Sequence, residues 1–441
     1  MPLPPGHKVP CEPRPGCNRY TPCGVRAAGV LEIPQTLYSD TRQNCTDNPT
    51  KPGVRPTACD HLHLPPEAVA RTRLREWLSQ HNVSEKQAAL RITGPRGDGF
   101  WVRVIWVLAH ATWAKRVGLP ISVAYHSPLM DSYYAPNLPG DGFTQYFEPV
   151  EHSPPNPTFL QLDCFAAARA WEDHGNYAER FDDAVQQRAA RTAMVEHLSL
   201  RPLPVLRDAA ESFWSEHFAR IAPGQTVLGV HLRGTDKQRW KLGLKPYADL
   251  AEAYLCAHPN ATVFVATDDE LLLRQFQIRL KRSGIQGSRL VWRKEVLRGN
   301  STLNAGVHAS MLGLNSRAAD LGWDVMLDTL LLSRVDFLIH TTSAVAEFAT
   351  ILNPRLQGPN SSYNLNLAKR GQPMPVWGTA HQAPAKACGH RPPAPPSVAR
   401  SADTGKVDGD FALVKQMLPK LQSRFLHKLL EAWMDEQRSD G

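Results

Sequence analysis

The chain has 441 residues and a formal net charge of +8, from 50 Lys and Arg against 42 Asp and Glu. This length predicts two lobes of roughly 150 residues each plus tails, and 42% hydrophobic residues exclude a largely disordered chain. The positive charges are spread along the chain rather than gathered in basic runs, so an anionic small ligand or a solvated surface is expected and nucleic-acid binding is not.

Residues 1–62 are rich in Pro, Cys, Gly and Thr without periodicity, which predicts an irregular extension. The spacing of its cysteines does not match the paired CxxC pattern of zinc sites, so a disulfide-stapled segment is favoured over free thiols. Their odd number leaves one thiol to pair elsewhere or to stay free. The five cysteines are Cys11, Cys17, Cys23, Cys45 and Cys59.

Glycosylation sequons agree with an oxidising compartment, and together with the cysteines they predict the lumen of the secretory pathway, specifically the Golgi. The start of the sequence shows no apolar signal-peptide core, and no run of eighteen apolar residues predicts a membrane span. Either a signal is missing from the sequence or the protein is not secretory. The sequons begin at Asn44, Asn82, Asn260, Asn300 and Asn360.

The N-terminal lobe, residues 63–222, opens with a strand, a glycine-rich loop, a helix and a second strand, which is a βαβ unit and predicts a parallel sheet. A helix is expected before this unit and a mainly helical segment after it. The expected elements are a helix at 65–80, a strand from Arg91, a helix at 100–116, a strand at 121–125 and helices within 164–219.

The C-terminal lobe, residues 223–370, alternates strands and helices throughout, which predicts a doubly wound parallel sheet. Residues 371–441 are expected to form a Pro-rich linker and a last amphipathic helix at 411–437. Strands of the lobe are expected at 226–230, 261–266, 290–292 and 335–339, and helices at 246–257, 268–282, 324–333 and 344–351.

Four polar or glycine-rich clusters come after predicted strands, where ligands of open parallel sheets collect. In 231–237, Arg233 has the forked donors that suit a departing diphosphate, although loop charges at a strand end explain the pattern equally well. In 340–344, hydroxyls at a helix start suit an anion site, against a structural role for the same hydroxyls. In 94–100, Gly97 and Gly99 allow close approach to a ligand but also serve any tight turn.

The cluster Thr267-Asp-Asp-Glu270 has a strong structural interpretation. Thr267 and Glu270 are spaced as a capping box, and Asp268 and Asp269 favour the positive end of a helix. Contact with a nucleotide would add to that role. The Asp pair has no third ligand nearby, so no metal site is expected.

Three segments occur in the order and spacing of a known family: His231-Leu-Arg-Gly-Thr-Asp-Lys237, Phe264-Val-Ala-Thr-Asp-Asp269 and the run from Asp324 to Phe348 that contains His340-Thr-Thr-Ser343. They resemble the fucosyltransferase superfamily of α1,6-fucosyltransferases, nodulation fucosyltransferases and protein O-fucosyltransferases. Gly97-Asp-Gly-Phe100 and Tyr146-Phe-Glu-Pro149 are similar to its N-lobe signatures. The resemblance covers residues 90–370 and is most specific in the C-terminal lobe.

The resemblance implies a GT-B-like fold, with two Rossmann-like lobes and a donor cleft between them. It also implies an inverting enzyme that needs no metal or other cofactor and uses GDP-fucose as donor. By the same resemblance, Arg233 grips the diphosphate and His231 lies against the guanine or ribose. The remaining implied donor contacts are Asp268 and Asp269 near the nucleotide, Thr342 and Ser343 on the phosphates, and Asp328 shaping the base pocket.

Two departures from the family bear on the mechanism. The α1,6 enzymes have a second arginine where this chain has Gly234, so Lys237 or Arg239 would supply that phosphate contact. An inverting transferase also needs a general base, and no carboxylate lies between Lys237 and Asp249. Asp236 is the expected catalytic partner of Arg233. Asp98 in the opposite lobe is the other candidate.

The sequence thus predicts transfer of fucose from GDP-fucose to a glycan or glycoprotein acceptor. Two alternatives stay open: the same fold with another nucleotide sugar, or a catalytically weak protein that binds a nucleotide or glycan. The linkage formed and the identity of the acceptor have no motif in the sequence.

Overall fold

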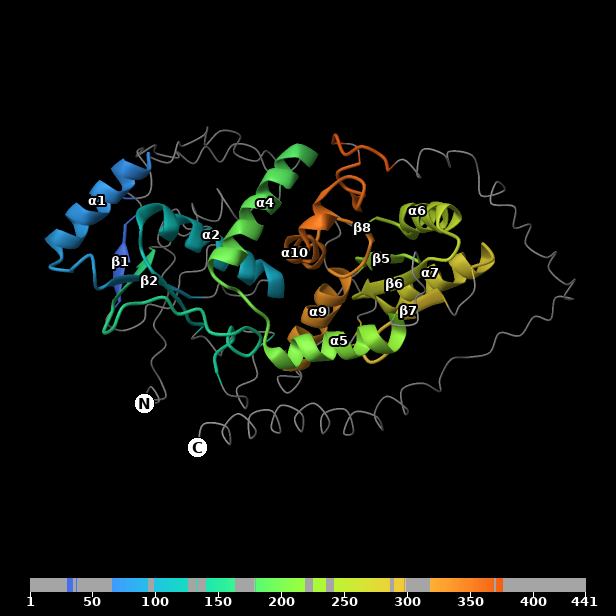
Figure 1. Cartoon of the computed structure of the whole chain (residues 1–441), viewed down its shortest axis with the longest axis horizontal. Coiled ribbons are helices and arrows are strands. Elements are labelled where there is room, and N and C mark those ends of the chain that lie inside the picture. Colours follow the sequence, from blue (N-terminus) through green and yellow to red (C-terminus); the bar gives the residue numbers. More distant parts are fainter. Residues whose placement is uncertain are drawn as a thin grey trace, which may run out of the picture.

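The computed structural model contains two sheets of parallel strands, each accompanied by helices (Figure 1). One sheet belongs to the N-terminal lobe and the other to the C-terminal lobe. The residues that the structure describes are 30–34, 37, 66–93, 99–125, 133, 140–162, 178, 180–218, 225–234, 242–285, 289–296, 298, 318–368 and 370–375.

The N-lobe sheet has four strands in the order β1-β4-β2-β3, and every pair in it is parallel. Two of its strands were not predicted. Strand β1 lies in the segment expected to be an irregular extension, so that expectation is wrong for these three residues, which pair with β4. The strands are β1 Leu31–Ile33, β2 Ala88–Ile92, β3 Ile121–Val123 and β4 Thr158–Leu162.

Helix α2, Phe100–Val117, comes after β2 and fills the centre of the N-lobe. It is apolar on nearly all sides, and a helix of that kind has to be buried on all sides. Gly118 ends it in a left-handed conformation at φ 79°, which a glycine adopts without strain. Helix α1, Glu67–Gln80, packs against α2. The positions of both helices, and the end of α2 at Gly118, match the sequence-based expectation.

The C-lobe sheet has five parallel strands in the order β7-β6-β5-β8-β9. The chain therefore winds outward from β5 in one direction and then returns to β8 on its other side. In such a sheet a crevice opens between β5 and β8, beyond the carboxyl ends of the strands. The strands are β5 Val227–Leu232, β6 Thr262–Thr267, β7 Leu290–Trp292, β8 Phe337–His340 and β9 Ser362–Asn364.

Helices connect these strands close to their predicted positions, and the predicted doubly wound sheet is confirmed. A short 3-10 helix, η7, links α10 to β9. The elements are α6 Leu244–Ala257, α7 Glu270–Arg282, α9 Ala318–Leu332, α10 Ala344–Leu352 and η7 Pro354–Gln357.

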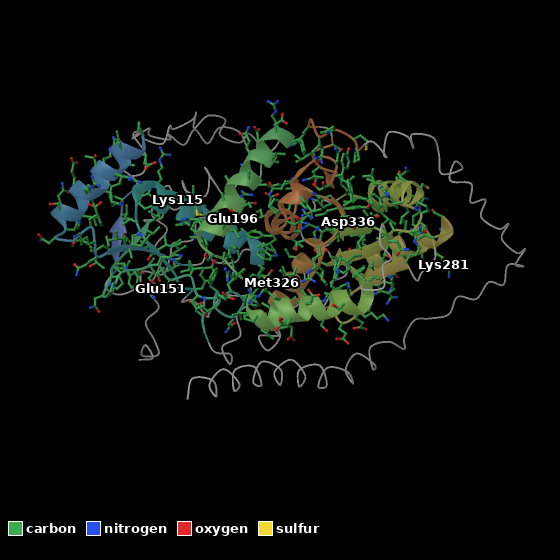
Figure 2. All side chains as sticks on the ribbon, viewed as in Figure 1. Lys115, Glu151, Glu196, Lys281, Met326 and Asp336 are labelled. Carbon is green, nitrogen blue, oxygen red and sulfur yellow. The ribbon has the colours of Figure 1, made fainter. Side chains whose placement is uncertain are left out.

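The two lobes are joined by helices rather than by strands. Helices α4, Phe181–His197, and α5, Pro204–Phe218, contact α10 and α9 of the C-lobe. Trp101 of α2 donates to Thr329 of α9 at 2.6 Å and stacks on Phe348 of α10, with ring centroids 4.1 Å apart. Met326 of α9 is fully buried near the middle of the molecule (Figure 2). The two Rossmann-like lobes confirm the predicted GT-B-like class.

Several expectations lie outside the described residues: the cysteines of the extension, most of the Pro-rich linker and the last helix at 411–437. Cys256 of α6 is disulfide-bonded. In the described part of the chain, no helix combines the length and apolar character that a membrane crossing requires.

Candidate functional site

Polar side chains lie directly beyond three neighbouring strands of the C-lobe sheet, at their carboxyl ends. Arg233 comes directly after β5, Asp268 after β6 and Thr341 after β8. Because these strands are parallel, the three segments meet at one edge of the sheet. The predicted clusters of the C-lobe are therefore one site in space.

The central contact of this site crosses the gap between β5 and β8. One guanidinium nitrogen of Arg233 donates to the hydroxyl of Ser343 at 3.2 Å. Ser343 is the N-cap of α10, yet its side chain makes no capping hydrogen bond to that helix. The hydroxyl thus faces the arginine, while the first amides of α10 are available for an anion. An arginine and a helix N-terminus together favour the binding of phosphate.

The segment between β8 and α10 is fixed by hydrogen bonds from other elements. The Tyr247 hydroxyl donates to the Thr341 hydroxyl at 3.2 Å, and the Thr342 amide donates to the side chain of Asn366 at 2.7 Å. The side-chain amide of Asn364 also donates to the Thr342 hydroxyl at 3.4 Å. Sequence reasoning missed Tyr247 and both asparagines, because nothing in the sequence places them beside this loop.

Asp268 and Asp269 have different partners. The carboxylate of Asp268 accepts from the Gly234 amide at 3.0 Å and so links the ends of β5 and β6. Asp269 is the N-cap of α7 and accepts from the Leu272 amide at 3.1 Å. The predicted capping box is wrong: the helix begins at Glu270, and the Thr267 hydroxyl instead accepts from the Asp269 amide at 3.1 Å.

Gly234 packs directly against Asp269. A Cβ atom at Gly234 would lie 2.2 Å from Oδ2 of Asp269 and 2.5 Å from its Cβ, which no real structure tolerates. An arginine, which the α1,6 enzymes have at this position, would therefore require Asp269 to move. The departure from the family pattern at Gly234 is thus coupled to the capping aspartate next to it.

Two histidines lie beneath the site. His231 of β5 and His340 of β8 are buried, at 4% and 1% exposure. Burial, with the charge of Arg233, lowers the pKa of His231 to about 3, and burial, with the charge of Arg188, lowers that of His340 to about 3. Both imidazoles are therefore neutral at physiological pH. The predicted contact of His231 with a base or ribose stays a prediction, and its side chain lies below the surface.

Asp328 lies on α9, where Arg293 binds it. Arg293 comes directly after β7 and contacts Asp328 at 3.1 Å and Asp324 at 2.6 Å. Burial raises the pKa of Asp328, with Arg293 acting in the opposite direction. Its carboxylate is thus engaged in a buried ion pair at the carboxyl edge of the sheet. Its predicted role in a base pocket stays a prediction.

A small cavity adjoins the site between α4 and the C-lobe. Its volume is about 10 Å³, which suits a single water. Arg188 and Ala184 of α4 line one side, and His340, Ser343 and Glu347 of the C-lobe line the other. A nucleotide is too large for this space.

No protein-family model matches the chain, and no curated protein matches it. Solved structures do match. The chain is similar to the fucosyltransferase NodZ from Bradyrhizobium, with 18% identity over 62% of this chain and 94% of that one and a TM-score of 0.33. It is similar to POFUT1 in complex with GDP, with 10% identity, 64% and 99% coverage and a TM-score of 0.38. A glycosyl transferase of family 9 from Veillonella parvula DSM 2008 also matches, with 10% identity, 64% and 87% coverage and a TM-score of 0.30.

These similarities are low in identity and in TM-score. The fold assignment therefore depends on the two parallel sheets and on the strand order β7-β6-β5-β8-β9.

The remaining predicted site residues are Asp236, Lys237, Gly97 and Gly99. Asp236, Lys237 and Gly97 lie outside the described residues. Gly99 is the N-cap of α2, where a Cβ atom would meet nothing closer than 3.9 Å, so the backbone there does not require glycine. Within the described ranges, no group of three or more His, Cys, Asp or Glu side chains could hold a metal ion.

A buried ion cluster behind the site was missed. Glu347 of α10 accepts from Arg188 and from Arg191 of α4, both at 2.9 Å, and all three side chains are buried. Although burial opposes ionisation, the two arginines hold the pKa of Glu347 below its usual range. A signal was present in the sequence, because both arginines fall on the same helical stripe as Phe181 and Ala184. Arginines on an apolar stripe indicate a buried partner.

Proposed function

We propose that the chain is a glycosyltransferase that binds a nucleotide diphosphate sugar at the carboxyl edge of its C-lobe sheet. The donor is GDP-fucose, and the sugar is transferred with inversion, without a metal ion, to a glycan or glycoprotein acceptor. The observation that carries the proposal is the contact of Arg233 with Ser343 across the gap between β5 and β8.

The charges of this edge support a diphosphate as the ligand. Arg233 keeps its positive charge at any physiological pH and can neutralise charge that develops on the leaving group. The N-terminus of α10 adds partial positive charge and free amides. His231 and His340 stay neutral, so neither adds a positive charge beside Arg233.

The choice of GDP-fucose depends on the sequence motifs that resemble fucosyltransferases. Arg233, Asp268 and Ser343 occupy the motif positions, and the observed hydrogen bonds join those three segments. Asp236 is proposed as the general base, since it lies three residues after Arg233 and no other carboxylate precedes Asp249. For an inverting step it would take the proton of the acceptor hydroxyl as that oxygen attacks the anomeric carbon.

The secretory lumen, and within it the Golgi, is the proposed location. The sequons and the cysteine-rich extension support it, as does the disulfide at Cys256, because disulfides persist in oxidising compartments. Treatment of the native protein with glycosidases that remove N-glycans tests the proposal: a mass decrease supports it, and an unmodified chain from a secretory expression host contradicts it.

The experiment for the function is a donor panel. The full chain is incubated with GDP-fucose, GDP-mannose and UDP-N-acetylglucosamine, each with a mixture of glycans and glycoproteins, and products are detected by mass spectrometry. Transfer of 6-deoxyhexose from GDP-fucose alone is the expected result. Transfer from another donor would overturn GDP-fucose as the donor but would still support a glycosyltransferase.

A second candidate is favoured by Gly234 and Asp269. Because Asp269 occupies the space of a side chain at residue 234, a second arginine is excluded at that position, and catalysis could be weak. A protein that only binds a nucleotide would bind GDP yet release no sugar from any donor in the panel. That result would establish the binding function instead.

A further inference from the structure

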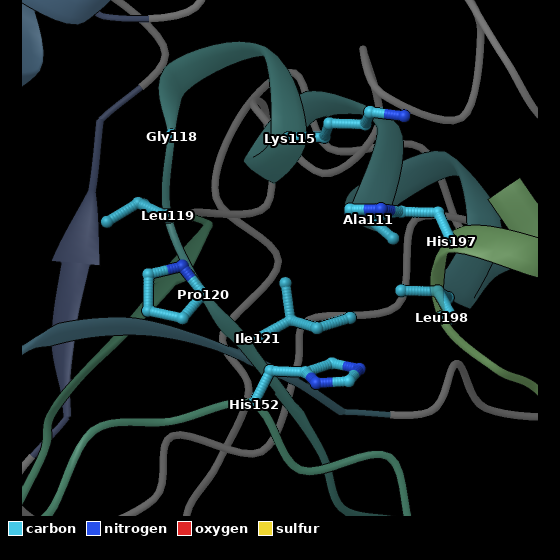
Figure 3. Close-up of a pocket in the computed structure, with 9 residues that line it drawn as sticks. All are labelled: Ala111, Lys115, Gly118, Leu119, Pro120, Ile121, His152, His197 and Leu198. Carbon is cyan, nitrogen blue, oxygen red and sulfur yellow. The ribbon is translucent and has the colours of Figure 1, made fainter.

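An open pocket lies on the N-lobe, with a volume of about 380 Å³. Its rim carries three basic side chains, Lys115, His152 and His197, and its floor contains the apolar residues Leu119, Ile121 and Leu198. In Figure 3, Ile121 lies between Lys115 above and His152 below, with His197 to the right. The pocket is large enough for one small organic molecule.

The pocket is separate from the proposed donor site. Lys115 belongs to the last turn of α2, His197 ends α4, and Ile121 begins β3. The pocket thus opens at the amino end of β3, whereas Arg233 lies beyond the carboxyl end of a strand in the other sheet. In Figure 2, Lys115 lies in the N-lobe half of the molecule, and Asp336 and Lys281 lie in the C-lobe half.

The charge of the rim is not balanced from within the pocket. None of the described residues that line it is acidic. Glu151, the neighbour of His152, already accepts from the Ser122 hydroxyl at 2.6 Å and from the Ser153 amide at 3.0 Å. The carboxylates next to these basic groups in sequence, Glu151 and Glu196, thus lie outside the lining of the pocket.

Lys115 and His152 act on His197. Partial burial, together with the charges of Lys115 and His152, lowers the pKa of His197. These groups come from three different segments of the chain, and the fold places them around one space. An anion bound between them would remove that repulsion and gain hydrogen bonds to charged donors.

We propose that this pocket binds a small organic anion, with a carboxylate, sulfate or phosphate held by Lys115, His152 and His197 and an apolar ring face on Leu119 and Ile121. An acidic monosaccharide has this combination of groups. The inference does not depend on the proposed transferase activity, because no residue of the donor site lines the pocket.

The test uses the full chain produced with isotope-labelled histidine. Ligands are added to it stepwise, and the imidazole resonances are followed by NMR. The ligands are glucuronate, glucose 6-sulfate, glucose 6-phosphate, inorganic sulfate and glucose. The resonances of His152 and His197, assigned with the variants His152→Gln and His197→Gln, are expected to shift with the acidic sugars and not with glucose. The acidic sugar that binds most tightly identifies the anionic group that the pocket prefers.

A double variant provides the quantitative arm. His152→Gln combined with His197→Gln is expected to weaken binding of the preferred acidic sugar about tenfold or more, as for the loss of hydrogen bonds to a charged group. His217→Gln, at an exposed histidine of α5, is the matched control and is expected to change nothing. Arg233→Ala is expected to leave this binding intact even if it abolishes binding of GDP.

Three outcomes would overturn the proposal. Equal shifts with glucuronate and glucose would exclude recognition of the charge. Binding of inorganic sulfate without binding of any acidic sugar would exclude the organic ligand. An unchanged affinity in the folded double variant would remove the two histidines from the site.

Discussion

The two sheets of the molecule differ in the residues that lie beyond the carboxyl ends of their strands. In the C-lobe, β5, β6 and β8 lead to Arg233, Asp268 and Thr341, and these segments are joined by hydrogen bonds. In the N-lobe, the described residues directly after β1, β2 and β3 are Pro34, Thr93 and Ala124, and the Thr93 hydroxyl accepts from the side chain of Gln161 of β4 at 3.2 Å. The basic groups of the N-lobe pocket lie instead near the amino end of β3.

This contrast separates two kinds of recognition. The C-lobe edge combines the guanidinium of Arg233 with the N-terminus of α10, which suits a diphosphate. The N-lobe pocket combines two titratable imidazoles and a lysine with an apolar floor, which suits a weaker acidic ligand. Between the lobes, the buried cluster around Glu347 joins α4 to α10 and so connects the N-lobe to the helix that begins at the donor site.

The largest expected effect is a loss of unfolding free energy at the junction between the lobes, which is the buried cluster of Glu347 with Arg188 and Arg191. Glu347→Ala leaves two buried arginines without their carboxylate, and removing one partner of a buried ion pair costs about 3–5 kcal/mol. Urea unfolding measures this loss. Glu85→Ala is the matched control, because Glu85 pairs with Arg75 at 3.1 Å on the surface and its loss is expected to cost less than about 1 kcal/mol. Equal losses in the two variants would contradict a structural role for the junction.

The next effect is on transfer at the C-lobe edge. Arg233→Ala is expected to lower the turnover of GDP-fucose by about 2–4 kcal/mol of transition-state stabilisation, since it removes the cation that faces the leaving diphosphate. Arg233→Lys keeps the charge but loses the forked donors and should retain part of the activity. The turnover number of each folded variant is measured with saturating donor. Full activity in the alanine variant would remove Arg233 from the mechanism.

A smaller effect, counted per pH unit, is expected from each of the buried histidines. The pKa of His231 and of His340 is about 3 in the folded state and 6.5 for the ordinary side chain, so below pH 6.5 the unfolded chain binds protons that the folded chain does not. The free energy of unfolding should therefore fall as the pH decreases from 6.5 toward 3, by about 1.4 kcal/mol per pH unit for each histidine. His340→Asn should reduce this slope. If His340→Asn leaves the slope of the unfolding free energy against pH unchanged, His340 is not a neutral buried side chain.

The smallest effect concerns the cap of α7. Asp269→Ala removes the hydrogen bond to the Leu272 amide and is expected to destabilise the fold by about 1 kcal/mol, whereas Asp269→Asn keeps an acceptor and should cost less. Thermal unfolding of the two variants compares them. Thr267→Ala changes the residue that the sequence suggested as the cap, and it should destabilise the fold less than Asp269→Ala does. A larger loss of stability in Thr267→Ala would support the capping box instead.

The fold of the C-lobe could be predicted from sequence more completely than that of the N-lobe. Strands β5 to β8 are short apolar runs, and β6 and β8 are each followed within a few residues by a helix, so the pattern of apolar and polar residues identifies them. Strand β1 has three residues and pairs with β4, more than a hundred residues later in the chain. A strand of that length has no periodic signal, and its pairing depends on contacts that only the folded chain makes.

The same distinction applies to the candidate site. Arg233, Asp268 and Ser343 come soon after strands in sequence, so parallel pairing alone brings them to one edge. Tyr247 and Asn364 contact this edge from α6 and from the end of β9, a strand that the sequence did not predict, and no local pattern places either side chain beside Thr341 or Thr342. Asp269 was expected near the nucleotide, and its capping of α7 depends on the exact residue at which that helix begins, which is the least predictable part of any helix.

The most direct test of the account is isothermal calorimetry of the full chain with GDP, UDP and ADP. GDP is expected to bind at least about tenfold more tightly than UDP or ADP, and Arg233→Ala is expected to weaken GDP binding by about tenfold or more. Equal affinity for the three nucleotides would contradict GDP-fucose as the donor. No binding of any of them by the folded wild-type chain would contradict a nucleotide site at the C-lobe edge.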